Sequence, residues 1–162
     1  MKHAATLLIA LLLTPATAAL AQSSGELDRE AIQDLRELVQ TQREQEIRDA
    51  LRLTSEEAER FWPVWERYND ELNEVRDRRV EMIVRYLEAF SNAEVDAELA
   101  RDLLNEFLDI ESDMLRIRKR YVRRFQQVIP AMKVTRFYQL ENKLDAEVDA
   151  ELAATMPLFD PM

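Results

Sequence analysis

Apolar residues recur along most of this chain at steps of four and three residues, which is the spacing of a single stripe on an α-helix. The first long series consists of Phe61, Trp65, Tyr68, Leu72, Val75, Met82 and Tyr86, with Arg79 at one further position. The second consists of Leu103, Phe107, Ile110, Met114, Ile117 and Tyr121, prolonged by Phe125 and Val128. Such stripes are typical of helices that pack against one partner helix, as in a coiled coil. No strand-like alternation persists anywhere, so the pattern predicts an all-α fold.

Capping residues indicate where these two helices begin. Thr54 is followed three residues later by Glu57, which is the pattern of a capping box and predicts a helix from Ser55 to about residue 90. Ser91 and Glu94 repeat the pattern, so we expect the next helix to follow at once and to continue to about residue 128. A short loop between two helices of similar length predicts an elongated antiparallel hairpin with a coiled-coil-like seam.

Two weaker apolar series flank the hairpin and complete a prediction of about four helices. The first runs from about Leu27 to Leu51, with apolar residues at Ala31, Leu35, Leu38, Val39, Ile47 and Leu51. The last follows Pro130, which is favourable in the first position of a helix because it has no N–H to satisfy. It spans about Ala131 to Ala153, with Phe137, Leu140, Leu144, Val148 and Leu152 expected to face inward. We therefore expect one helical domain over residues 22–155 and a C-terminal tail over residues 156–162.

The N-terminus has the three parts of a secretory signal peptide. A basic start at Lys2 precedes an apolar run from Ala4 to Leu13, and small residues then end in Ala19-Leu20-Ala21. A membrane anchor is the alternative, but an anchor needs about 20 apolar residues and Thr14-Pro15 interrupts this run. We expect residues 1–21 to be removed near Ala21 and the remainder to be exported.

Composition excludes several classes of function. The formal net charge is −10, and it becomes −11 once Lys2 is removed with the signal, which argues against a nucleic-acid-binding protein. There is no cysteine, and the single histidine, His3, lies in the signal, so the usual ligands of zinc and copper and the commonest catalytic base are missing. The single glycine, Gly25, cannot form a phosphate-binding loop. We expect neither enzymatic activity nor a cofactor.

Side chains that could hold a metal do not form a distinctive pattern. Single methionines at core spacing indicate packing rather than ligation, and these are Met82, Met114 and Met132. The available carboxylates are Glu56, Glu57, Asp145 and Asp149.

A basic run in the second long helix is the first candidate binding site. Six of nine consecutive residues are basic: Arg116, Arg118, Lys119, Arg120, Arg123 and Arg124. One interpretation is that they pair with the acidic first helix and with residues 141–160. The other is that they form a basic patch that attracts acidic partners.

Trp62 and Trp65 form the second candidate site. Their spacing prevents both from facing one narrow seam, so we expect at least one to face the first helix, a partner chain or solvent. If the hairpin folds about residues 91 and 92, they lie opposite residues 118–122, where cation–π contacts are possible. Burial in the core is the alternative.

One short segment resembles the motif of a known family, and a second keeps the motif's pattern of a capped helix start but not its letters. Leu53-Thr54-Ser55-Glu56-Glu57 is similar to the L-T-x-x-Q motif of the Spy/CpxP (LTxxQ-motif) family of bacterial periplasmic proteins, with Glu57 in place of the glutamine. Where that family has its second copy, this chain has Ile129-Pro130-Ala131-Met132-Lys133. The similarity covers about residues 27–155, and the order of signal peptide, first helix, hairpin and last helix also matches.

The resemblance implies a periplasmic location and a binding function. It implies an ATP-independent chaperone or an envelope-stress accessory protein that binds unfolded or envelope protein clients. The alternative that it implies is a signalling accessory or metal-responsive sensor that modulates a membrane sensor kinase or a sigma-factor regulator. Such proteins often form dimeric cradles with a basic concave side, with which residues 116–124 are compatible. Because a thin hairpin cannot bury its whole apolar stripe alone, the pattern independently predicts a homodimer.

Overall fold

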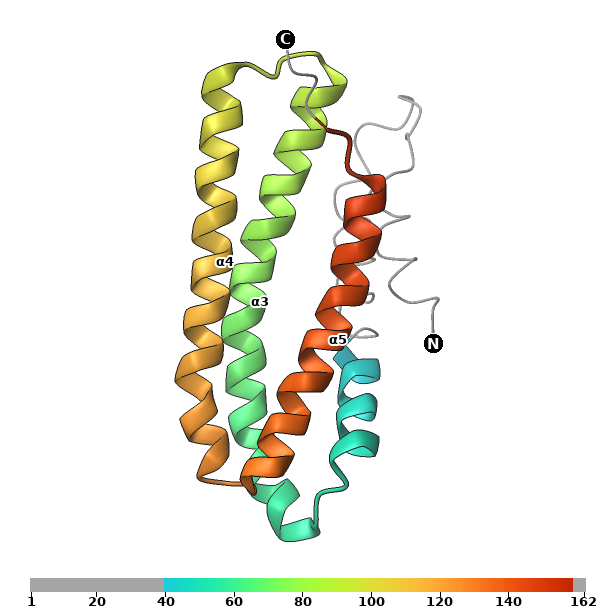
Figure 1. Ribbon diagram of the computed structural model, residues 1–162, viewed down its shortest axis with the longest axis vertical. Helices are drawn as coiled ribbons and strands as arrows, with labels where there is room; N and C mark the ends of the chain where they lie inside the picture. Colours follow the sequence, from blue (N-terminus) through green and yellow to red (C-terminus); the bar gives the residue numbers. More distant parts are fainter. Residues whose placement is uncertain (1–39, 159–162) are drawn as a thin grey trace, which may run out of the picture. The chain divides into compact units, whose positions relative to one another are not determined.

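The computed structural model describes residues 40–158 of the chain, and every regular element in that range is a helix. A helix over residues 40–51 is followed by α3 (Ser55–Ser91), α4 (Ala97–Gln126) and α5 (Ala131–Thr155), as Figure 1 shows. Within these residues the prediction of an all-α fold with about four helices is confirmed. The predicted signal peptide, the first helix before residue 40 and the tail after residue 158 lie outside the described residues. No helix between residues 40 and 158 is both long enough and apolar enough to cross a membrane.

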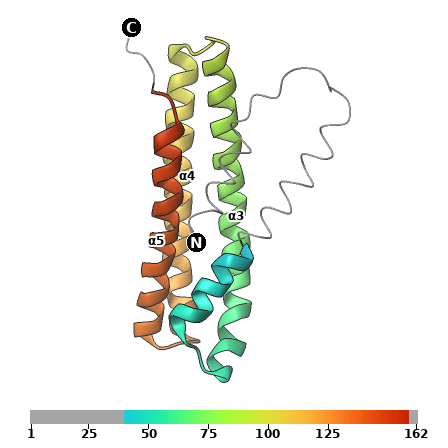
Figure 2. The same cartoon turned by 90° about the vertical axis from the view of Figure 1, so that its right-hand side faces the viewer.

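The chain divides into two compact units, of which Leu53–Val134 forms the first, here called the hairpin unit. In it α3 and α4 lie side by side and antiparallel, and Figures 1 and 2 show this from two directions. The predicted seam is largely correct, because all seven apolar residues of the α3 series are buried. The α4 series supplies Leu103, Ile110, Met114, Ile117, Tyr121 and Phe125. Phe107 was expected in this seam but is 38% exposed, and Val128 is only half-buried.

Aromatic contacts fix which residues of α3 and α4 face each other. The rings of Phe61 and Phe125 lie 5.4 Å apart, and those of Tyr68 and Tyr121 lie 5.3 Å apart. Phe61 therefore lies opposite Phe125. Folding about residues 91 and 92 had predicted a place opposite residues 118–122. The loop between the helices is longer than expected, which moves the centre of the hairpin towards the C-terminus.

The predicted capping box at Ser91 and Glu94 is wrong, because Ser91 is the last residue of α3. Ala93 has a φ of 55°. The Ala93 N–H donates to the carbonyl of Phe90, and the Glu94 N–H donates to that of Ala89, which is the bonding of a Schellman motif. The N-cap of α4 is Asp96, whose Oδ1 accepts the N–H groups of residues 98 and 99 at 3.0 and 2.8 Å. The chain thus uses residues 92–96 to close one helix and start the next.

The predicted capping box at the start of α3 is confirmed. The Thr54 Oγ1 accepts the Glu57 N–H at 3.2 Å, and the Glu57 Oε2 accepts the Thr54 N–H at 2.8 Å. Where the unit ends in sequence, the Pro130 carbonyl accepts the N–H groups of Lys133 and Val134 at 2.9 and 3.1 Å. Pro130 therefore stands immediately before α5, one residue earlier than the first helical position that we predicted for it.

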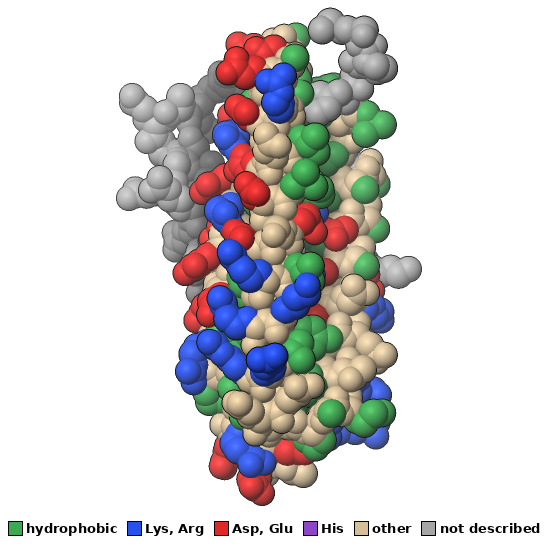
Figure 3. All heavy atoms as spheres, turned by 60° about the vertical axis from the view of Figure 1, so that its left-hand side comes forward, with side chains coloured by type: hydrophobic (Ala, Val, Ile, Leu, Met, Phe, Trp, Pro, Cys, Tyr) green, Lys and Arg blue, Asp and Glu red, His purple; other side chains and the backbone are tan. Residues whose placement is uncertain are grey.

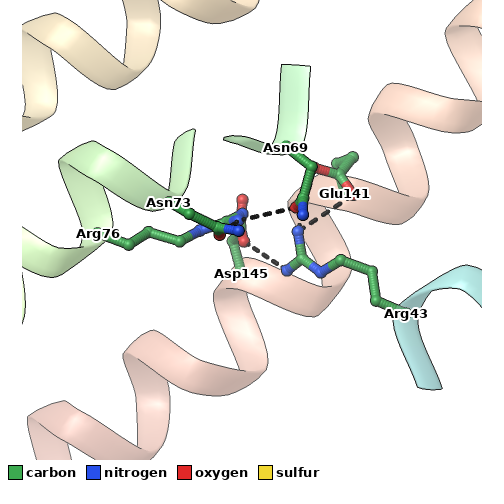
Figure 4. Close-up of polar contacts among 6 residues, drawn as sticks. All are labelled: Arg43, Asn69, Asn73, Arg76, Glu141 and Asp145. Atoms are coloured by element: carbon green, nitrogen blue, oxygen red, sulfur yellow. Dashed lines mark hydrogen bonds and ion pairs between the residues drawn. The ribbon is translucent and has the colours of Figure 1, made fainter. Parts of the chain in front are cut away.

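The second unit contains the helix over residues 40–51 and α5 from Thr135 onward. Arg43 connects them, as Figure 4 shows: its Nη1 lies 3.1 Å from both carboxylate oxygens of Glu141, and its Nη2 lies 2.8 Å from Asp145. Ile47 and Leu51 are buried, and so is Phe137, which was predicted to face inward. The inward positions predicted at Leu140, Leu144, Val148 and Leu152 are half-buried. The α5 helix ends at Thr155, the C-terminal limit expected for the helical domain.

Candidate binding surface on α4

The basic run predicted as a binding site lies mostly on the surface of α4. Arg116, Lys119, Arg120, Arg123 and Arg124 are exposed, and Arg118 is half-buried. Ile117 and Tyr121, which interrupt the run, are buried in the seam with α3. The run therefore covers the outer and lateral sides of α4 near its C-terminal end.

Some of these cations belong to a series of ion pairs that joins α3 to α4. Glu71 pairs with Arg120, Arg78 with Asp113, and Arg85 with Glu106. Successive pairs are seven residues apart on each helix, so they repeat every two turns along one side of the hairpin. Tyr121 adds a hydrogen bond from its hydroxyl to Glu71 at 2.7 Å. These contacts favour one register of the hairpin, although each exposed pair contributes little by itself.

Asp113 lies at the centre of this series and also accepts a hydrogen bond from Arg116 of its own helix. The hydrogen bond from Arg78 is the main cause of a lowered pKa of the Asp113 carboxyl, and the positive charges of Arg116 and Arg78 add to it. A shallow groove of about 420 Å³ lies here, and carboxylates and guanidinium groups both line it, among them Glu74, Arg78 and Arg116. Since its charges are mixed, the groove does not select a ligand of one sign.

The structure partly answers how the basic run is neutralised. Arg116 and Arg120 have partners inside the hairpin unit, Asp113 and Glu71. Two acidic residues from the region that we considered as a partner, Glu141 and Asp145, pair with Arg43. The guanidinium of Arg124 lies 4.4 Å from the ring centre of Tyr121, and that of Arg120 lies 5.8 Å from it. The cation–π contacts therefore form on a tyrosine of the same helix.

The two tryptophans are not placed as surface anchors. Trp65 is 1% exposed and belongs to the core, so the prediction that it contacts a partner is wrong for the folded chain. Trp62 is half-buried, and its ring lies edge-on to Trp65 at 5.3 Å and to Phe61 at 5.2 Å. The expectation that the pair cannot share one seam is met, because only Trp65 is fully buried.

Four large apolar side chains on α4 are exposed, and sequence reasoning did not single them out as a surface. Leu104 is 57% exposed, Leu108 54% and Leu115 49%, and Phe107 lies beside them. At 3.6 residues per turn the three leucines fall on one side of the helix, turned away from the seam with α3. We call Leu104, Leu108 and Leu115 the outer stripe. A signal existed in the sequence, because Leu104, Leu108 and Leu115 directly follow Leu103, Phe107 and Met114 of the seam series and so repeat its helical spacing.

The outer stripe and the basic run are neighbours on one face. Figure 3 turns towards the viewer the side of Figure 1 on which α4 lies. Lys and Arg side chains gather in the lower half of this view, with hydrophobic and acidic side chains above them. Lys119 and Arg123 are exposed in the basic half. An apolar strip beside a cluster of cations is suited to binding a segment that carries both apolar and acidic residues.

Metal-binding side chains do not gather in the part of the chain that the structure describes. No three His, Cys, Asp or Glu side chains lie close enough to hold an ion between residues 40 and 158. Glu57 is bonded to Lys133, and Asp145 to Arg43. Met82 and Met114 pack in the core as predicted, whereas Met132 is 82% exposed, so its predicted core position is wrong.

Residues 53–57, which resemble the family motif, and residues 129–133, which stand where the family has its second copy, meet in the hairpin unit. Glu57 from the first segment accepts a hydrogen bond from Lys133 of the second. Ile129, also in the second segment, is buried. Leu53 is half-buried and Thr54 caps α3. Comparisons of the chain with protein-family models, with curated proteins and with solved structures give no match. Membership of the Spy/CpxP family therefore stays a prediction.

Proposed function

We propose that this protein is an exported, ATP-independent, chaperone-like binding protein of the bacterial envelope. It holds unfolded or partly unfolded clients on the outer face of α4. The observation that carries the proposal is the outer stripe of three exposed leucines beside the exposed basic run.

The outer stripe supplies the attraction for apolar client segments. Scattered exposed leucines are ordinary, but apolar side chains that adjoin one another on one face are typical of interaction surfaces. Burying one such side chain contributes roughly 1.5–3 kcal/mol at most, and the folded chain already covers about half of the surface of each of these leucines. A few of them support weak, reversible binding, which suits a protein that must release its client without ATP.

The basic half supplies longer-range attraction. Lys119 and Arg123 are exposed and lie next to the outer stripe along α4. In a chain of net charge −10 they form a local positive region, so acidic client segments are drawn to this face rather than to the rest of the surface. This part of the attraction is screened by salt, whereas the apolar part is not.

The apolar contribution is tested by light scattering with reduced α-lactalbumin, which aggregates once its disulfides are broken. We expect the purified protein at a few-fold molar excess to suppress aggregation. The triple variant Leu104→Ser, Leu108→Ser, Leu115→Ser should lose most of this suppression. Met132→Ser is the matched control, because it removes an apolar side chain that is 82% exposed elsewhere. Absence of suppression by the wild type, or full suppression by the triple variant with helical circular dichroism retained, contradicts the proposal.

The basic contribution is tested by a second pair of variants. Lys119→Ser with Arg123→Ser should weaken suppression at low ionic strength, and the difference from wild type should disappear at high salt. Arg136→Ser with Lys143→Ser is the control, since both side chains are exposed on α5 and the charge change is the same. An equal loss of aggregation suppression in both double variants would mean that suppression depends on net charge and not on the face of α4.

A further inference from the structure

The charges of α4 are separated along its length. Up to residue 113 the helix carries six carboxylates and one cation, Arg101, and from residue 114 to its end it carries six cations and no carboxylate. In Figure 3 acidic side chains lie above the basic ones on the side of the molecule where α4 lies. A chain that lies along this helix therefore passes from an acidic surface to a basic one.

Contacts inside the hairpin unit neutralise part of each half. Three carboxylates of α4 pair with arginines of α3, and the pairs are Glu106 with Arg85, Glu111 with Arg79 and Asp113 with Arg78. In the basic half, Arg116 and Arg120 pair with carboxylates of the same unit. Glu98 lies one turn from Arg101, so these two charges offset each other. Charges outside these contacts are available to a partner.

Four other exposed charges of α4 take part in none of these contacts, two in each half. Asp102 and Asp109 lie in the acidic half, Lys119 and Arg123 lie in the basic half, and none has an ion-pair partner between residues 40 and 158. Asp102, Asp109 and Arg123 are separated by multiples of seven residues, so they lie along one side of the helix. Lys119 is four residues from both Leu115 and Arg123, which places it between that side and the outer stripe. The outer stripe therefore has negative charge beside one end and positive charge beside the other.

We infer that the outer face of α4 selects client segments by the order of their charges, and that it takes an apolar segment with acidic residues at one end and basic residues at the other. This inference rests on the proposed function and names the class of client. The acidic end lies against Lys119 and Arg123, the basic end lies against Asp102 and Asp109, and the apolar middle covers the outer stripe. A segment with mixed charges at each end is attracted and repelled at both.

The spacing along α4 sets the length of the apolar middle. Leu104 and Leu115 are eleven residues apart in the helix, which is roughly 16 Å at 1.5 Å per residue. An extended client covers that length with about five residues, at about 3.3 Å each. The face offers side chains alone, because the backbone N–H and C=O groups in the middle of a helix are bonded to each other. The order of charges is therefore recognised, whereas the direction of the client chain is not.

The inference is tested with labelled peptides of identical composition, whose binding is followed by fluorescence anisotropy. All have the same apolar middle of about five residues. The first has two aspartates before it and two lysines after it, the second is the first in reverse order, and the third has one aspartate and one lysine at each end. At low ionic strength the wild type should bind the first and second peptides equally, and about threefold or more tighter than the third. The difference should disappear at high salt.

A pair of double variants locates this preference on α4. Asp102→Lys with Asp109→Lys makes the whole flank basic, so the first peptide should bind no tighter than the third. Glu59→Lys with Glu66→Lys is the matched control and should keep the preference, because both side chains are exposed on α3 at the same seven-residue spacing and the charge change is the same. Loss of the preference in both double variants overturns the inference.

The remaining outcomes separate this inference from the proposed function. Equal affinity of the wild type for the first and third peptides overturns the charge selection. If that equal binding is lost in the triple leucine variant, the proposed function still stands. If no peptide binds, a second copy or another part of the chain covers the face, and the charge selection is overturned. Suppression of α-lactalbumin aggregation then decides the proposed function by itself.

Discussion

Lys133 in the first turn of α5 donates a hydrogen bond from Nζ to the Oε2 of Glu57, in the first turn of α3, at 2.5 Å. The same carboxylate oxygen accepts the backbone N–H of Thr54 at 2.8 Å. One side chain therefore completes the cap of α3 and ties it to a residue 76 positions later in the chain. The contact joins the segment that resembles the LTxxQ motif of the Spy/CpxP family, residues 53–57, to residues 129–133, which stand where that family has its second copy. Glutamate carries the negative charge that pairs with Lys133, whereas the glutamine of the family motif is uncharged.

This contact predicts the order of stability of two variants at position 57. Glu57→Gln keeps a side-chain oxygen for the Thr54 N–H but loses the charge that pairs with Lys133, so its thermal midpoint should be lower than that of the wild type. Glu57→Ala loses both contacts and should be lower still. Thermal unfolding followed by circular dichroism measures the order. Glu59→Gln, at an exposed position of the same turn, should leave the midpoint unchanged.

The same contact predicts a dependence on pH. The hydrogen bond from Lys133, followed by that from the Thr54 backbone, lowers the pKa of the Glu57 carboxyl from its usual 4.5. A carboxyl with a lowered pKa stabilises the fold at pH values above its unfolded pKa and loses that effect as the pH falls through its folded pKa. The difference in midpoint between wild type and Glu57→Gln should therefore be constant near neutral pH and shrink below about pH 4.5. A difference that grows on acidification would contradict the role given to Glu57.

Two phenylalanines of α4 distinguish the observed seam from the one that spacing predicts. Phe125 is fully buried against Phe61 and Tyr68, so Phe125→Ala should lower the free energy of unfolding by about 3–5 kcal/mol. Phe107→Ala should cost much less, because that side chain is 38% exposed. Urea unfolding of both variants measures the two losses. Similar losses of unfolding free energy in the two variants would mean that Phe107 is in the core, which would contradict the observed seam.

Ala93 closes α3 in a conformation that glycine adopts more easily. Its φ of 55° lies in the left-handed region, where a residue with a Cβ costs about 1–2 kcal/mol. Ala93→Gly should therefore stabilise the protein, by about 0.5–1 kcal/mol after the greater freedom of glycine in the unfolded chain is counted. Ala100→Gly, inside α4, is the control and should destabilise by about 1 kcal/mol. A lower stability of Ala93→Gly in urea unfolding would argue against this helix end.

The residues of the seam were predictable because the buried apolar side chains recur in the sequence at helical spacing. From Phe61 to Tyr86 the steps of four and three identify one face of α3, and Thr54 with Glu57 marks its start. The loop was not predictable in the same way. Ser91 and Asp96 are both good N-caps, and the usual sign of a helix end, a glycine at the position of Ala93, is absent.

The candidate site was predicted in part. Basic residues 116–124 were identified because their density is unusual in an acidic chain, and most are exposed. The outer stripe escaped notice because each of its leucines directly follows a residue of the seam series, and Phe107 was assigned to that series. The tryptophans were misplaced for a related reason: aromatic size suggests a binding anchor, but the position of Trp65 in the α3 series already indicated the core.

The central claim, that clients bind the outer face of α4, is tested most directly by photocrosslinking. A benzophenone amino acid at Leu108 or at Lys119 should give covalent adducts with unfolded, carboxymethylated α-lactalbumin. The same group at Glu81, exposed on α3, or at Met132 should give few. Adducts concentrated at positions 108 and 119 are the predicted result. Equal adducts at all four positions, or adducts only at 81 and 132, would contradict the account.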